Sequence, residues 1–131
     1  MNQGLSKIER LKSRKLIEQL FAEGKTIKSY PIILVYLALD NEEGKPPLQI
    51  AVSVSKRKFK RAPDRNKVKR KLREAYRTQK HLFLNTFNSN KRYIAMFIYV
   101  SNEHVPSEQI NVKIKSLLTR LSDSINTHSN D

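Results

Sequence analysis

The sequence contains no cysteine and only three glycines among its 131 residues. Without cysteine there are no disulfide bonds and no cysteine-ligated zinc sites, which suits a reducing, cytoplasmic location. With so few glycines we expect no glycine-rich loop of the kind that cradles nucleotide phosphates. The longest apolar runs, residues 32–39 and 93–100, are far shorter than the ~20 residues of a membrane span. The N-terminal residues do not resemble a signal peptide. We therefore expect a soluble cytoplasmic protein with no membrane partner.

Acidic residues are also scarce, and the cations are concentrated in one place. The chain has 12 Asp and Glu against 26 Lys and Arg, a net charge of +14. Residues 56–80 hold 13 of these cations, and their only acids are Asp64 and Glu74. Such a concentration repels itself unless a polyanion neutralises it. The charge therefore predicts a nucleic-acid partner.

Capping residues and apolar periodicity predict three helices. Ser13 is a suitable N-cap for a first helix that starts at Arg14 and ends at Gly24. Asp64 is a suitable N-cap for the basic helix, and Ser107 for the last helix.

Extended segments are expected over residues 26–39, 48–55 and 93–100, where β-branched residues or strict alternation dominate. The order of elements predicts a single-domain α+β fold, an α/β sandwich with three helices and a small central mixed sheet. We expect this domain to span residues 13–125, between a flexible basic segment, 1–12, and a flexible tail, 126–131.

The basic helix has two distinct faces at 100° per residue. Its apolar stripe consists of Val68, Leu72, Ala75 and Tyr76, and the opposite face carries Asn66, Arg70, Arg73 and Arg77. A solvated charged face is the simpler interpretation, but such a face usually intersperses acids for i,i+4 pairing. Arginines at this spacing suit successive phosphates, and Asn66 suits a base edge, a 2′-hydroxyl or a hydrated metal ion.

A second candidate site combines apolar and polar groups near the first helix. Ile17, Phe21 and Tyr36 are either core residues or the stacking floor of a cleft for single-stranded bases, and the residues alone leave both readings open. The groups expected around such a cleft are Ser53, Ser55, Lys56, Arg57 and Lys58.

No catalytic constellation stands out. His81, His104 and His128 are scattered, and none has an acid at a suggestive spacing. Asp40 and Glu43 lie in a polar turn that is more typical of a solvated loop than of a metal site. We therefore expect no catalytic group in the protein itself.

Two runs carry a specific resemblance: Ser53-Val54-Ser55-Lys56-Arg57, and the stretch from Arg61 to Arg77 that contains Arg65-Asn66-Lys67. Together they resemble the signature of the bacterial ribonuclease P protein subunit, and the likeness extends from about Leu11 to Leu121. The resemblance implies a left-handed β-α-β crossover at the basic helix.

The resemblance also implies roles for individual residues. The basic helix would face the catalytic RNA through Arg65, Asn66, Lys67, Lys69, Arg70, Arg73 and Arg77. The cleft for the 5′ leader of precursor tRNA would be formed by Ile17, Phe21, Tyr36, Ser53, Ser55, Lys56 and Arg57. Lys67 stands where the family has arginine, Ile17 where an aromatic residue is common, and Val35 is the ungapped match to the family's tyrosine.

By the same resemblance, the partners would be ribonuclease P RNA and precursor tRNA, not DNA, with the chain a monomer in the holoenzyme. The activity would be endonucleolytic removal of the leader, with Mg²⁺ held mainly by the RNA. Whether the protein also binds a metal ion near Asn66 stays open. A double-stranded-RNA-binding or ribosomal protein is the alternative, although the strand near residues 93–100 and the last helix argue against it. A stand-alone metal nuclease using Asp40 or Glu43 is a further alternative.

Overall fold

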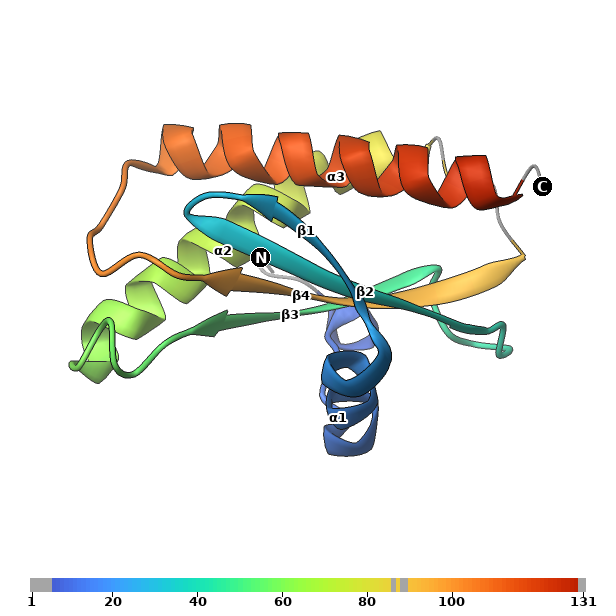
Figure 1. Cartoon of the computed structure of the whole chain (residues 1–131), viewed down its shortest axis with the longest axis horizontal. Helices are drawn as coiled ribbons and strands as arrows, with labels where there is room; N and C mark the ends of the chain where they lie inside the picture. The colour runs from blue at the N-terminus through green and yellow to red at the C-terminus, as the bar shows by residue number, and fades with distance from the viewer. Residues whose placement is uncertain (1–5, 86, 88–89, 130–131) are drawn as a thin grey trace.

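The computed structural model describes residues 6–85, 87 and 90–129. One sheet with strand order β1-β2-β4-β3 lies at the centre (Figure 1). Its strands are β1 (Lys25–Ser29), β2 (Ile32–Asp40), β3 (Leu48–Val54) and β4 (Lys91–Tyr99). The helices are a short 3-10 turn, η1 (Lys7–Glu9), followed by α1 (Arg14–Glu23), α2 (Ala62–Leu84) and α3 (Ser107–Ser129). The β1–β2 and β2–β4 pairs are antiparallel and the β3–β4 pair is parallel. The expected α+β fold with a mixed sheet is confirmed.

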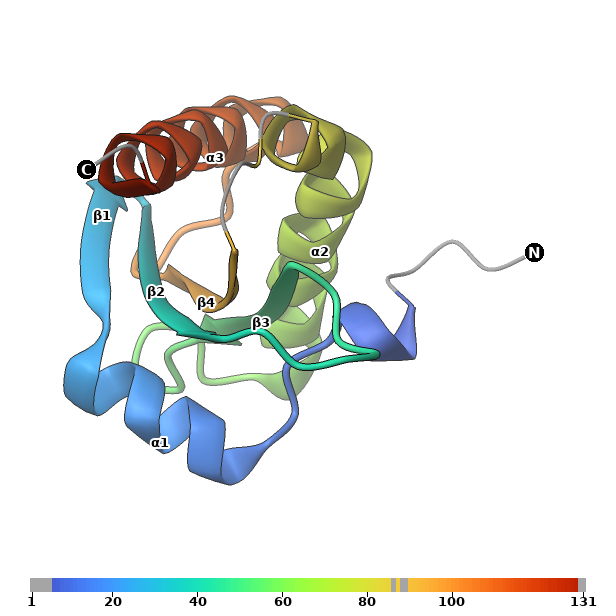
Figure 2. The same cartoon turned by 90° about the vertical axis from the view of Figure 1, so that its right-hand side faces the viewer.

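The helix α2 forms the crossover between the parallel strands β3 and β4. Figure 2 looks along these strands, which run away from the viewer, with β3 to the right of β4 and α2 above the sheet. A path from β3 through α2 to β4 therefore turns in the left-handed sense. Ordinary β-α-β units are right-handed in about 98% of cases, so this hand agrees with the expectation from the family resemblance.

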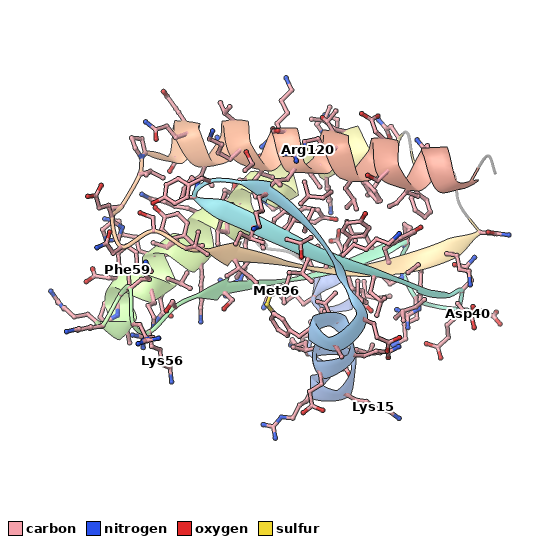
Figure 3. All side chains as sticks on the ribbon, viewed as in Figure 1. Lys15, Asp40, Lys56, Phe59, Met96 and Arg120 are labelled. Atoms are coloured by element: carbon pink, nitrogen blue, oxygen red, sulfur yellow. The ribbon has the colours of Figure 1, made fainter. Side chains whose placement is uncertain are left out.

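The sheet separates two hydrophobic clusters. On one face, α2 and α3 pack over a large core that includes Leu34, Phe97 and Tyr76. On the other face, α1 crosses the sheet alone (Figure 2) and buries a smaller cluster with Leu20 and Met96. Met96 points from β4 toward α1 (Figure 3). One face is thus fully covered, whereas the face beneath α1 is covered only in part.

Local chemistry at both ends of α1 agrees with the sequence prediction. The Ser13 hydroxyl accepts a hydrogen bond from the backbone N–H of Leu16 at 3.2 Å, as an N-cap does. Gly24 follows the last helical residue, but its φ of −71° is not left-handed. A Cβ at this position would lie 2.3 Å from the Leu20 carbonyl oxygen and 2.8 Å from Val35 Cγ1. Glycine is therefore required by the close approach of α1 to β2.

The predicted N-caps of the other two helices lie inside those helices and not before them. The helix α2 begins at Ala62, and Arg61 occupies the N-cap position without a side-chain cap. Pro63 fits the first turn because no intrahelical hydrogen bond is needed there, so the helix starts ahead of Asp64. Ser107 is the first residue of α3 and not its cap, and α3 continues to Ser129, past the predicted boundary at residue 125.

Residues 6–12 pack against the domain, although they belong to the segment that was expected to be flexible. The η1 turn has a capping box between Ser6 and Glu9. Leu11 is buried, and its backbone N–H donates to the Ile50 carbonyl at 2.8 Å. Residues 1–5 lie outside the described part of the chain. Within the described residues, no helix is long and apolar enough to cross a membrane.

Candidate nucleic-acid interface

The two faces of α2 are arranged as the sequence predicts. Val68, Leu72, Ala75 and Tyr76 are all at most 1% exposed and anchor the helix to the core. The opposite face turns outward, with three exposed side chains, Asn66, Lys67 and Arg70, and four half-buried ones, Arg65, Lys69, Arg73 and Arg77. The fold therefore presents a row of cations on one side of a rigid helix.

Two arginines on this face differ in their surroundings. Arg77 binds Glu74 through two contacts, one of them between Nε and Oε2 at 3.0 Å. The hydrogen bond from Arg77 lowers the pKa of the Glu74 carboxyl. Arg73 faces other cations instead: burial, and then the charges of Arg10 and Arg70, lower the pKa of its guanidinium. Arg77 is thus paired, whereas Arg73 is surrounded by like charge.

Arg65 is turned toward its own chain. Its Nη1 donates to the carbonyl oxygens of Phe59 at 2.8 Å and Lys60 at 2.9 Å. Phe59 is buried, and its ring packs against Tyr99 and, edge to face at 4.8 Å, against His104. Arg65 therefore fixes the segment before α2, a role that the sequence did not indicate.

That segment, residues 55–61, is called the basic loop below. The backbone N–H groups of Lys58 and Phe59 donate to the Ser55 carbonyl, and the Ser55 hydroxyl accepts from the backbone N–H of Arg57 at 3.1 Å. Lys56, Arg57, Lys58, Lys60 and Arg61 are exposed, and Lys56 points away from the sheet (Figure 3). Beside the loop lies a hollow of about 760 Å³ lined by four loop residues and the end of β4.

Three of the residues predicted to form the cleft, Ile17, Phe21 and Ser53, lie on α1 or on the sheet face beneath it. Phe21 is 56% exposed, and Ile17 is half-buried against the smaller cluster. On the strands, Ile33 pairs with Ile98, which pairs with Ser53, and all three are half-buried. The row from Ile33 through Ile98 to Ser53 thus ends two residues before the basic loop begins, and the ring of Phe21 is exposed on α1.

The prediction that Tyr36 shares this face is wrong. Side chains alternate along a strand, so Tyr36 points into the large core, where it is 8% exposed and lies 6.5 Å from Tyr93, centroid to centroid. Its neighbour Val35 belongs to the cluster under α1. Val35, the ungapped match to the family's tyrosine, therefore lies on the sheet face beneath α1.

The surroundings of Asn66 do not fit a divalent cation held by protein groups alone. Its neighbours on the helix face are Lys67 and Arg70, which would repel a cation. The carboxylate of Asp64 lies 4.0 Å from Arg61 and 3.8 Å from His104. Among the described residues, no three His, Asp or Glu side chains form a group able to bind a metal. Asp40, at the end of β2, pairs with Lys91 at 2.8 Å.

A model of the Ribonuclease P family matches residues 5–122. The chain belongs to the ribonuclease P protein family. It is 37% identical over 123 residues to the Ribonuclease P protein component of Porphyromonas gingivalis, covering 93% of this chain and 89% of that protein. The protein component of Chlorobaculum tepidum is 29% identical, with 84% and 77% covered.

Solved structures of the family share the fold. The RNase P protein from Thermotoga maritima matches with a TM-score of 0.66 at 24% identity, over 86% of this chain and 96% of that one. The Staphylococcus aureus protein matches with a TM-score of 0.64 at 20% identity, over 86% and 94%. At these identities the likeness concerns the fold alone, and the roles of individual residues stay predictions.

Two features of the interface were missed from the sequence. The hydrogen bonds of Arg65 to the Phe59 and Lys60 carbonyls depend on the path of the basic loop. That path cannot be predicted from the periodicity of the sequence. Arg10 and Lys12 line the same small hollow as Arg73 of α2, and this was hidden because residues 1–12 have no long apolar pattern. The one available signal was Leu11, a single apolar residue between two cations.

Proposed function

We propose that the chain is the protein component of ribonuclease P, and that it binds the catalytic RNA and the 5′ leader of precursor tRNA. The observation that carries the proposal is α2, a helix anchored by one apolar stripe with an acid-poor cationic face, in a chain that matches the family over residues 5–122. In this proposal the chain acts in the cytoplasm as one copy per holoenzyme and assists endonucleolytic release of the leader.

The RNA subunit would supply the hydrolytic chemistry with Mg²⁺, which is consistent with the poor fit of the residues near Asn66 to a protein-held cation. The chain's own task is electrostatic. Lys67, Arg70 and Arg73 would neutralise phosphates of the catalytic RNA, and each neutralised phosphate steepens the salt dependence of binding. Arginine suits this task because its planar fork can donate two parallel hydrogen bonds to one phosphate.

The leader would lie across the sheet face beneath α1. The exposed ring of Phe21 offers a stacking platform, and base–aromatic stacking is worth about 1–3 kcal/mol per base. The half-buried Ile33 and Ile98 extend the apolar floor, and Ser53 can bond to a base or a ribose. The phosphates of the leader would continue along the basic loop, which Arg65 holds through its hydrogen bonds to the Phe59 and Lys60 carbonyls.

The experiment is reconstitution with ribonuclease P RNA and precursor tRNA, comparing two variants with a matched control. For Phe21→Ala we expect the affinity of the holoenzyme for leader-bearing substrate to fall by ~5- to ~150-fold, the equivalent of the stacking energy. Its affinity for leaderless tRNA should not change, because the ring contacts only the leader. Val112→Ala is the control, because Val112 is also an exposed apolar residue (63%) but lies on α3.

Arg70→Glu should instead weaken binding to the catalytic RNA and leave the leader contribution intact. Unchanged holoenzyme assembly with Arg70→Glu at physiological salt would refute the assignment of α2. Equal losses for Phe21→Ala with and without a leader would refute the cleft. Preference for any A-form duplex over a structured RNA with a 5′ extension would favour a double-stranded-RNA-binding role.

A further inference from the structure

A hollow of about 420 Å³, called the α3 hollow below, lies between the sheet and the C-terminal part of α3. Figure 1 shows this part of α3 above the start of β4, with the basic loop at the opposite end of the sheet. Pockets for small organic molecules occupy about 300–1,000 Å³, so the α3 hollow has the size of a ligand site. Its lining includes Lys25, Tyr36, Ala38 and Tyr93 from the sheet and Ser124 and Ile125 from α3.

One small side chain between two large ones accounts for the α3 hollow. Tyr36 and Ala38 are two residues apart on β2 and therefore share one face of the sheet. Ala38 pairs across the sheet with Tyr93, and Tyr36 pairs with Lys25. The two tyrosine rings lie 6.5 Å apart, centroid to centroid, and are tilted by 42°. The methyl group of Ala38, which is exposed, leaves the space beside these rings open.

The hydroxyls of these two tyrosines have no partner in the described part of the chain. Each tyrosine is only 8% exposed, and a buried phenol usually forms a hydrogen bond. The Tyr99 hydroxyl does so, with a backbone carbonyl between β4 and α3. The hydrogen bond and charge of Asp40, and then the nearby oxygen of Tyr93, raise the pKa of the Lys91 amine. The phenol end of Tyr93 therefore lies close to the rim, where Lys91 is found.

The charges at the rim of the α3 hollow balance one another. Glu23 at the end of α1, Lys25 at the start of β1 and Lys91 at the start of β4 line it. The amine of Lys91 donates to the Asp40 carboxylate at 2.8 Å, so two acids stand against two lysines in a chain whose net charge is +14. Attraction and repulsion largely cancel for an anion in such surroundings. The rim therefore favours an uncharged ligand, and not the polyanion proposed for α2.

We propose that the α3 hollow binds a small, neutral aromatic compound that carries a hydrogen-bond donor and an acceptor. The ring of the ligand would lie over Ala38, where it meets the tyrosine rings in offset or edge-to-face contact. The hydroxyls of Tyr36 and Tyr93 would bond to its polar group, since a phenol can both donate and accept. The site is independent of the proposed function, because Tyr36 faces away from the cleft assigned to the leader.

The first experiment titrates the whole chain with benzamide at about 150 mM salt, and the dissociation constant is read from the Ala38 and Ser124 amide resonances. We expect Tyr36→Phe and Tyr93→Phe each to weaken binding by ~5-fold, the loss of one hydrogen bond. Tyr30→Phe is the matched control, because Tyr30 is 69% exposed and does not line the α3 hollow. Equal affinity of wild type, Tyr36→Phe and Tyr93→Phe would overturn the proposal.

The second experiment fills the α3 hollow with Ala38→Leu. The larger side chain occupies the place of the ring, so we expect benzamide binding to be abolished. The fold should tolerate this change because Ala38 is exposed, and urea unfolding checks that it does. Thr26→Leu adds an exposed leucine to the opposite face of the sheet and should bind benzamide as wild type does. Wild-type affinity in Ala38→Leu would place the ligand elsewhere and refute the site.

The class of ligand is tested with toluene and benzoate, which have the same ring as benzamide. Toluene has no hydrogen-bonding group and benzoate carries a negative charge, so we expect both to bind at least ~5-fold more weakly. Toluene as tight as benzamide would rule out the hydrogen bonds, and benzoate as tight would rule out the preference for a neutral ligand. Because RNA is absent from all these titrations, their failure leaves the proposed function standing, and failure of the proposed function leaves this site standing.

Discussion

Replacement of Glu74 by glutamine is expected to tighten the binding of this chain to the catalytic RNA. Glu74 is the one acid between Arg65 and Arg77 on α2, and it binds Arg77 through two contacts. From the sequence, Arg70 and Arg77 are equivalent members of one helix face. In the structure only Arg70 is free of an acidic partner among the described residues. Glu74→Gln should release Arg77 for a phosphate.

The magnitude follows from counterion release. One additional phosphate contact steepens the slope of log affinity against log salt by ~0.7–0.9. Between about 50 and about 200 mM salt, a slope change of this size alters the ratio of the Glu74→Gln affinity to the wild-type affinity by ~3-fold. Arg70→Gln should shift the slope by a similar amount in the opposite direction, because it removes a contact.

The assay is equilibrium binding of labelled catalytic RNA at four or more salt concentrations, for wild type, Glu74→Gln, Arg70→Gln and Glu108→Gln. Glu108 is exposed in the first turn of α3 and controls for the change in net charge alone. A Glu74→Gln slope equal to that of Glu108→Gln would refute the reasoning, since Arg77 would then lie outside the interface.

Three further outcomes are expected. Gly24→Ala should destabilise the fold by ~1–3 kcal/mol in urea unfolding, because its Cβ would press on the Leu20 carbonyl oxygen at 2.3 Å. Gly44→Ala, which meets no atom within 4 Å, should cost only the ~1–2 kcal/mol of its left-handed backbone. Burial raises the pKa of the Glu9 carboxyl, but the hydrogen bonds from Lys80 on α2 and from Ser6 at the start of η1 outweigh burial, so the pKa is lowered. Its stabilising contribution is therefore present above the unfolded carboxyl pKa and is lost as the pH falls through the lowered folded value. The stability difference between wild type and Glu9→Gln should thus disappear in acid unfolding. Arg65→Gln should weaken leader binding more than catalytic-RNA binding, and a double-mutant cycle with an exposed lysine of the basic loop should show coupling.

Periodicity predicted those parts of the fold that depend on one local pattern. The stripe of α2 is buried as expected because a 3.6-residue repeat places Val68, Leu72 and Tyr76 on one side whatever lies opposite. The Ser13 cap and the end of α1 at Gly24 were also predicted from signals in neighbouring residues. The Asp64 cap was wrong because Pro63 is favourable inside a first turn, so two start signals competed.

Other features depend on contacts between distant segments. The side of the sheet on which Tyr36 lies is decided by the register of β2 with β4, and a shift of one residue reverses it. The family resemblance placed Arg65 itself among the residues that face the catalytic RNA, and nothing in the sequence pointed to partners within the chain. Its partners are carbonyl groups five and six residues earlier in the chain, and only the folded path of the basic loop brings them within reach.

The bridge between Arg10 and Ile50 also bears on solubility. The strand β3 is at one end of the sheet, and residues 10–11 cover part of its outer edge with backbone hydrogen bonds. An uncovered edge strand is a template for pairing with another chain. Truncation at residue 13, the domain boundary that the sequence predicted, would remove this cover together with a charged residue that discourages edge pairing. We expect such a shortened chain to self-associate through β3, so that residues 10–11 would guard the full chain against aggregation.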